Sequence, residues 1–453
     1  MSARERRATL SLSAVFALRM FGMFSILPVL SIHAHSLPGG SSTFLVGVAL
    51  GIDGLAQACL QIPFGLLSDR IGRKPVIYGG LVLFALGSFI AAEASSIEIV
   101  ILGRLVQGMG AIAAAVTALV ADLTLEENRA KSMAVIGMSI AGAFAASMVL
   151  GPMLEHMIGV SGIFAVTGVL GVLAIAIIRF LVPDPDSQRV HADAETVPAK
   201  VGGVIRNLDL LRLNVGMFIL HATMRGIFIV VPLILVSTGQ LPVAEHWKIY
   251  LPIVILSFAA VMPAIVLGES RGQMKAVLAG GVALLLAANG LMAAYMNDFV
   301  VVLGALFIYF VTFNLLEAVL PSLVTKIAPV GSRGTAIGVF NTFQFLGLFL
   351  GGAFGGYIVQ QGGWSAVFLF ASGSAALWLI VVLTMRRPPA VRTRMYHVGE
   401  MNESRGRELS AALSHLNGVA EAVVIAAEGV AYLKVRLGEW DEAGALKLMA
   451  KGV

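Results

Sequence analysis

The chain has 453 residues, of which 58% are hydrophobic and only 13% charged, with a net charge of +5. A soluble domain carries about 25% charged residues, so this composition excludes a soluble enzyme, a disordered chain and a nucleic-acid-binding module. The single cysteine, Cys59, excludes an intramolecular disulfide and a thiolate metal site. We expect neither a metal nor a cofactor.

Apolar segments of about 20 residues, the length that crosses a bilayer, recur from residue 10 to residue 385. The first follows three arginines, as in a signal peptide, but its length and the many later segments indicate a retained helix. The predicted transmembrane spans are residues 10–32, 43–67, 76–95, 97–121, 132–155, 160–181, 210–236, 247–268, 276–296, 299–325, 334–359 and 363–385. They predict an all-α membrane protein with twelve helices.

The spans form two groups of six separated by a polar stretch. We expect a first bundle over residues 1–182, a linker over 183–209, a second bundle over 210–389 and a separate domain over 390–453. Lys and Arg gather in the loops on one side of the bilayer, whereas the opposite loops carry mostly acids. Because basic loops stay in the cytoplasm, we expect a bacterial-type inner (plasma) membrane protein with both termini cytoplasmic.

The two bundles resemble each other at an offset of roughly 200 residues, as repeated halves of transporters do. Arg19 corresponds to Arg225, and RIGRK at 70–74 corresponds to RGQMK at 271–275. Repeated halves usually surround a central site and move against each other. Chance similarity between apolar helices is the alternative.

The composition changes after residue 389, where about a quarter of the residues become charged, as in soluble domains. The pattern predicts strands over 394–398, 419–425 and 430–437 and helices over 403–416 and 440–451. This βαββα order is typical of a small ferredoxin-like α+β domain. The tail contains no cysteine, so thiolate capture of copper or zinc is excluded.

The loop between the second and third spans has the sequence GLLSDRIGRKP, at residues 65–75. It resembles the signature loop of the major facilitator superfamily, and the twelve-span layout is similar to that family over residues 10–385. The resemblance implies that Asp69 contacts the start of the eleventh span, where a helix N-terminus favours an anion. This contact would hold the two halves together on the cytoplasmic side.

We expect this latch to break when the halves separate, and we expect Arg73 to pair with Asp122. The second copy, at 268–275, lacks an acid in the place of Asp69, so the latch is predicted to be one-sided. The alternative is that the loop is basic only because it faces the cytoplasm, but this explains neither Asp69 nor Gly65. The latch residues are Gly65, Asp69, Arg70, Gly72, Arg73, Lys74, Asp122, Gly334 and Thr335.

Two further segments resemble motifs of the proton-coupled antiporters of this superfamily: RLVQGMGA at 104–111 and GAFAASMVLGP at 142–152. This resemblance implies antiport over symport or uniport, whereas small-residue spacing alone is a common device for close helix packing. The predicted packing residues are Gly108, Gly142, Gly151 and Pro152. Within the superfamily, ALRMFGMFSILPVL at 17–30, FNLLEAVLPSL at 313–323 and GTAIGVFNTFQFLG at 334–347 resemble segments of YajR-type transporters. The appended domain of that family implies a regulatory role here. A passive folded tail is the alternative.

Ionisable residues inside the bilayer are costly and are functional candidates. The helical rise places Asp53 and Arg104 at similar depth, with Arg19 closer to the cytoplasm. We hypothesise that Asp53 is the proton-titrating group, that Arg104 is its partner, and that Arg19 belongs to the same group. A permanent structural ion pair is the alternative.

On the seventh span, His221 and Arg225 lie one turn apart, which suits an anionic or polar substrate. Alternatively, Arg225 pairs with a carboxylate such as Glu317, although the helical rise separates these two by about 13 Å in depth. Four further polar residues either line the same cavity or bond between helices: Asn314, Glu317, Asn341 and Gln344.

The sequence predicts a secondary transporter that moves a small molecule by alternating access, with protons as the coupled ion and export as the direction. The expected partners are the small-molecule substrate, protons and membrane lipid, but no nucleic acid. The buried charges form no nucleophile and base pair, so we do not expect an enzyme. The alternative is a ligand sensor that signals through its C-terminal domain. No feature of the sequence indicates an oligomeric state.

Overall fold

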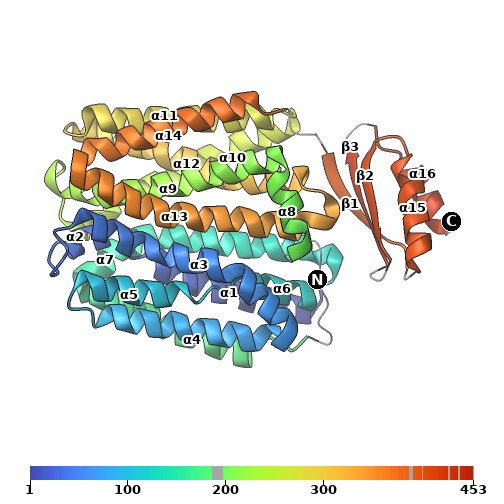
Figure 1. Ribbon diagram of the computed structural model, residues 1–453, viewed down its shortest axis with the longest axis horizontal. Helices are drawn as coiled ribbons and strands as arrows, with labels where there is room; N and C mark the ends of the chain where they lie inside the picture. Colours follow the sequence, from blue (N-terminus) through green and yellow to red (C-terminus); the bar gives the residue numbers. More distant parts are fainter. Residues whose placement is uncertain (186–196, 387–390, 400, 427–428, 437–438, 452–453) are drawn as a thin grey trace.

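The computed structural model describes residues 1–185, 197–386, 391–399, 401–426, 429–436 and 439–451. A helical bundle is followed by a small α+β domain beyond one end (Figure 1). We call this the domain end, where the N-terminus also lies, and the opposite one the far end. The middle of the predicted linker, the predicted boundary at residues 389–390 and Leu437 lie outside the described residues.

The first half begins earlier than predicted. Ser2 caps the first helix and Glu5 completes a capping box. A capping box can begin a helix in a polar segment, so this helix begins before the apolar residues. Gly159, with φ of 67°, divides the longest helix into the two predicted spans. The helices are α1 Ala3–Phe24, α2 Leu30–Ala34, α3 Thr43–Ile71, α4 Arg73–Ala92, α5 Ile97–Gly108, α6 Ala113–Leu123 and α7 Glu126–Phe180.

The second half follows the linker helix, α8 Pro198–Arg206. Its helices are α9 Leu208–Ser237, α10 Trp247–Ser270, α11 Met274–Tyr295, α12 Phe299–Ile327, α13 Arg333–Gly362 and α14 Trp364–Thr384, with short 3-10 turns η1 Val243–Glu245 and η2 Val330–Ser332. Ten segments of the described chain are long and apolar enough to cross a membrane. One of them holds the two spans around Gly159, and α1 runs beside α7. The predicted all-α fold of two six-helix halves is confirmed.

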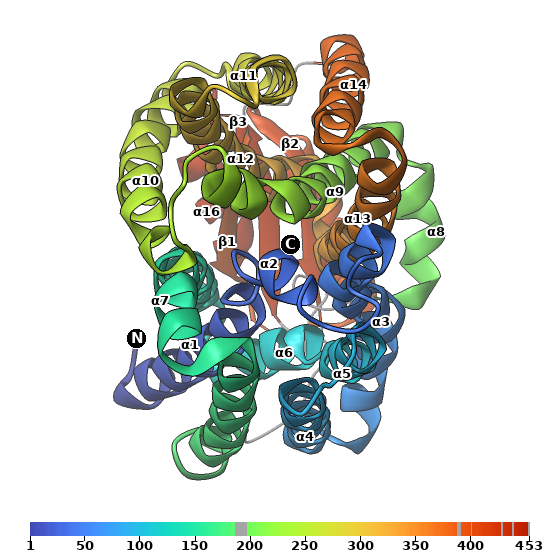
Figure 2. The same ribbon diagram turned by 90° about the vertical axis from the view of Figure 1, so that its left-hand side faces the viewer.

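The two halves meet along α3 and α13, and along α7 and α10 (Figure 2). Near the far end, α3 and α13 touch backbone to backbone at glycines: a Cβ on Gly51 would lie 2.6 Å from the carbonyl oxygen of Leu348. The side-chain oxygen of Gln360 accepts hydrogen bonds from the Ser42 hydroxyl and the Phe44 amide, both 3.1 Å long. The far end is therefore closed.

Toward the domain end, the same two helices leave a cavity of about 60 Å³ between them. Gly65 and Asp69 line it from α3, and Gly334 and Asn341 line it from α13. Contact between the halves is thus tightest near the far end.

The C-terminal domain has the predicted βαββα order. Its elements are β1 Val391–His397, α15 Glu403–Ser414, β2 Val419–Ile425, β3 Val430–Arg436 and α16 Glu442–Lys451. The strands pair antiparallel in the order β1-β3-β2. Leu409 and Leu413 of α15 pack on Leu433 and Val435 of β3, so the helices cover one face. The sheet stands between these helices and the bundle (Figure 1), and the predicted small α+β domain is confirmed.

We expect Gly51→Ala to destabilise the protein, because the added methyl group meets the backbone of α13. Overpacking of this kind costs about 1–3 kcal/mol. The matched control is Gly304→Ala in α12, where nothing lies within 4 Å of the added Cβ. Alanine favours a helix over glycine by about 1 kcal/mol, so the control should be neutral or stabilising. Thermal unfolding midpoints in detergent measure both, and equal midpoints would contradict the close contact.

Candidate functional site

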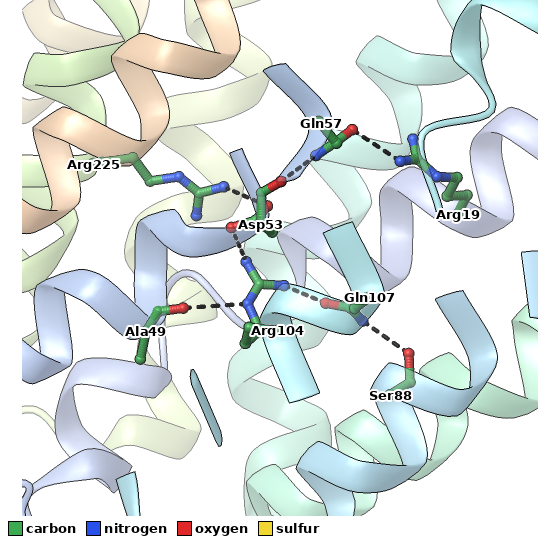
Figure 3. Close-up of polar contacts among 8 residues, drawn as sticks. All are labelled: Arg19, Ala49, Asp53, Gln57, Ser88, Arg104, Gln107 and Arg225. Atoms are coloured by element: carbon green, nitrogen blue, oxygen red, sulfur yellow. Dashed lines mark hydrogen bonds and ion pairs between the residues drawn. The ribbon is translucent and has the colours of Figure 1, made fainter. Parts of the chain in front are cut away.

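Asp53 on α3 lies at the centre of a buried polar network (Figure 3). Its Oδ1 is 2.7 Å from Nη2 of Arg104 on α5, in the same half. Its Oδ2 is 3.4 Å from Nη2 of Arg225 on α9, in the other half. All three side chains are fully buried. One carboxylate therefore joins the two halves of the bundle.

Amide and hydroxyl groups extend this network within the first half (Figure 3). Gln57 accepts a hydrogen bond of 2.8 Å from Arg19 and donates one of 3.3 Å to the carbonyl oxygen of Asp53. Arg104 donates to Gln107, which donates to Ser88. The predicted neighbours of Asp53 are thus present, with Arg19 connected through Gln57.

Gly108 explains how Arg104 comes so close to α3. A Cβ at Gly108 would lie 2.6 Å from the Cα of Asp53, so only glycine allows this approach. Gly151 similarly faces the carbonyl oxygen of Ser25, and Pro152 beside it is buried within α7. Gly142 is different, because nothing lies within 4 Å of a Cβ placed there. The predicted packing role of Gly142 is wrong, since that face of α7 has no close neighbour.

Three predicted substrate residues gather in the second half. Nε2 of Gln344 lies 2.8 Å from Nε2 of His221 and 3.5 Å from Oε1 of Glu317. Nε2 of His221 lies 3.6 Å from Oε2 of Glu317. These side chains come from α9, α12 and α13, so the cluster connects three helices of one half.

The other three predicted substrate residues lie elsewhere. Arg225 points to α3 and pairs with Asp53, because a buried cation needs a carboxylate. Its carboxylate partner is therefore Asp53 rather than Glu317, and its side chain is fully buried. Asn314 donates a 2.9 Å hydrogen bond to Ser257 and so connects α12 to α10. Asn341 lines the cavity near the domain end instead. The expectation that all six residues line one cavity is wrong.

The signature loop forms the predicted ion pair between α4 and α6. Nε of Arg73 lies 3.2 Å from Oδ2 of Asp122, with both side chains almost fully buried. Arg73 also contacts Asp69. Gly72, with φ of 104°, supplies the left-handed turn between α3 and α4. Lys74 reaches the exposed Asp184 at 2.6 Å.

Two other latch residues lie at the edges of this loop. Gly65 allows α3 to approach α6, because its Cβ would lie 3.3 Å from that of Ala114. Arg70 is exposed near the end of α3.

The expected contact between Asp69 and the start of α13 is not formed in the described structure. Asp69 pairs with Arg73, and the small cavity separates it from Gly334. The Thr335 hydroxyl instead accepts a 2.9 Å hydrogen bond from the amide of Val197, just before α8. The physical reason is that the halves are packed together near the far end and stand slightly apart here.

The C-terminal domain contacts the turn between α12 and α13. Lys434 donates to the carbonyl oxygen of Ala328 and lies 3.1 Å from Glu421, which accepts a 3.0 Å hydrogen bond from the amide of Val330. Burial lowers the pKa of Lys434, and Glu421 opposes this shift. Further contacts are Arg333 to Thr393, Val330 to Val430 and Tyr432, and Lys200 of α8 to Gly331. This turn therefore joins the domain, the linker helix and α13.

Two halves of six helices that meet around buried polar residues are the architecture of a membrane transporter. The chain belongs to the Major Facilitator Superfamily, whose family model matches residues 12–352 and 255–416.

Curated relatives extend over most of the chain. It is 42% identical to the inner membrane transport protein YajR of Escherichia coli, over 96% of this chain and 95% of that protein. It is 26% identical to the multidrug resistance protein MdtH of Aeromonas hydrophila, over 82% and 94%. Among solved structures, the human organic anion transporter MFSD10 superposes with a TM-score of 0.63 at 19% identity, covering 84% of this chain and 100% of that one. The chain is thus similar to inner-membrane multi-pass transporters.

We expect Arg73→Met to destabilise the protein by about 3–5 kcal/mol, because it removes the cation beside the buried Asp122 carboxylate. Adding Asp122→Leu to the same chain should recover most of the loss, since an apolar pair replaces the buried ions. Lys74→Met is the matched control: its partner is 88% exposed, and such pairs contribute about 0–1 kcal/mol. Denaturant unfolding measures all three, and an equal loss for Lys74→Met would contradict this assignment.

Proposed function

We propose that this protein exports a small molecule across the inner membrane in exchange for protons, by alternating access. The observation that carries the proposal is the Asp53 carboxylate, which is shared between Arg104 of one half and Arg225 of the other. A buried group that joins the moving halves and can take up a proton couples protonation to their movement. The basic loops orient the domain end toward the cytoplasm, so the closed far end faces outward.

Ionised Asp53 attracts Arg225 and favours closure of the far end. Opposite unit charges 4 Å apart attract by about 4 kcal/mol at an effective dielectric constant of 20. A proton on Asp53 removes that attraction and leaves two guanidinium groups facing one carboxylic acid. The halves then separate near the far end. The membrane potential adds about 2.3 kcal/mol per charge and 100 mV to any step that moves the charge across it.

In the alternate state, the domain end closes. We infer that the start of α13 then approaches Asp69, whose carboxylate is held by Arg73 on the opposite wall of the small cavity. The N-terminus of a helix stabilises a nearby carboxylate by about 0.3–1 kcal/mol. Export agrees with the similarity to MdtH, a multidrug resistance protein.

A sensor that signals through its C-terminal domain is the second candidate. It is favoured by the contacts of Lys434 and Glu421 with the turn before α13. Those contacts also suit a transporter whose domain controls the start of α13. Net substrate flux separates the two functions.

We expect Asp53→Asn to abolish substrate-dependent proton movement, because asparagine neither takes up a proton nor attracts Arg225. The measurement is proton flux into liposomes that contain the purified protein, with an interior pH dye and a panel of candidate substrates. Glu93→Gln is the matched control, since Glu93 is exposed in a far-end loop. Unchanged coupling in Asp53→Asn would overturn the role of this carboxylate, and binding without flux in the unmodified protein would favour the sensor.

We expect Lys434→Ala to release the start of α13 and to shift the equilibrium toward the state that is open at the far end. A hydrogen bond to a charged group contributes about 1.5–3 kcal/mol, which is about tenfold or more in the equilibrium. Ser41→Cys and Gln361→Cys, both at exposed far-end positions, carry spin labels in a Cys59→Ala chain. A longer distance between the two labels reports the opening. Lys447→Ala, on the exposed face of α16, is the control. Identical distance distributions would identify the domain as a passive tail.

A further inference from the structure

Among the described ionisable residues in the interior of the bundle, Glu317 has the most exposed side chain. Its side chain keeps 38% of its surface exposed, whereas that of His221 keeps 6%. The other ionisable groups of the interior, Arg19, Asp53, Arg104 and Arg225, are at most 1% exposed. A molecule that enters the bundle can therefore reach the exposed part of the Glu317 side chain, whose Oε2 atom is itself buried, but none of these guanidinium groups.

This carboxylate has no lysine or arginine partner among the described residues. Its neighbours are the neutral amide of Gln344 and the ring of His221, and its Oε2 accepts no hydrogen bond. An ionised carboxylate inside a membrane is costly unless a cation compensates it. Arg225 does not compensate it, because that guanidinium is paired with Asp53.

A cluster of aromatic rings from both halves extends from His221, the neighbour of this carboxylate. Phe313 lies one helical turn from Glu317 on α12, and its ring is 5.7 Å from that of His221. The ring of Phe144, on α7 in the first half, stacks on Phe313 at 6.0 Å and meets Phe24 edge-on at 5.2 Å. Aromatic faces attract cations and apolar groups but not anions.

We propose that Glu317 and these rings form the binding site for an organic cation with a bulky apolar body. The proposal rests on the transport function proposed above and names its substrate class. The cation supplies the missing partner of the carboxylate, and its apolar body packs on Phe313. Because Phe144 belongs to the other half, an occupant of this site contacts both halves and can bias their movement.

Tetraphenylphosphonium and tetraphenylborate test the charge, because the two ions have nearly the same shape and opposite charges. We expect the full chain in nanodiscs at neutral pH to bind tetraphenylphosphonium in equilibrium dialysis and to bind tetraphenylborate far more weakly. Glu317→Gln should weaken tetraphenylphosphonium binding by about tenfold or more. Glu269→Gln, at the domain end beside Lys326, should leave it unchanged. Thermal unfolding checks that both variants are folded.

Preferential binding of tetraphenylborate would overturn the proposal and assign the interior to anions. Tetraphenylphosphonium binding that Glu317→Gln leaves unchanged would also overturn it, because the cation would then bind elsewhere. The proton-flux assay with Asp53→Asn tests the coupled function separately. If the cation binds at Glu317 but no proton moves, proton coupling fails and this site stands. If another substrate drives protons and tetraphenylphosphonium does not bind, only the substrate class fails.

Discussion

A carboxylate that has lost its water must be compensated, and at Asp53 two guanidinium groups from opposite halves do so. The surrounding packing serves this contact. Gly108 lets α5 approach the backbone of Asp53, and Gly51 and Gly54 on either side of it let α3 approach α13. Without these glycines, the helices would stand too far apart for one short side chain to reach both arginines.

The fold could be predicted from the sequence because length and hydropathy determine it. Apolar segments of bilayer length indicated the helices, and the change in charge indicated the C-terminal domain. The contact between Asp53 and Arg104 was also predictable, because depth along neighbouring spans follows from the rise per residue. Depth alone gives neither the rotation of a helix nor the angle between halves. For that reason the sequence leaves Arg225 open between a substrate and an internal carboxylate, and it does not identify Asp53 as that carboxylate.

The same limit explains the polar residues on α13. Asn341 and Gln344 are three residues apart, yet the first lines the small cavity near Asp69 and the second contacts His221. A motif also describes the family rather than one conformation of the protein. The resemblance of the signature loop implied a contact between Asp69 and α13, but in this conformation a cavity lies between them. Here Thr335 bonds to the amide before α8 instead.

The two kinds of contact between the halves act over different ranges. Backbone contact at glycines depends on dispersion, which falls steeply when atoms move apart by an ångström. The attraction between Asp53 and Arg225 falls only as the inverse of their separation. Packing at the far end therefore defines the closed state sharply, while the ion pair still attracts the halves after that packing is lost. A transporter needs this difference, because a small change in charge then selects between two well-defined arrangements.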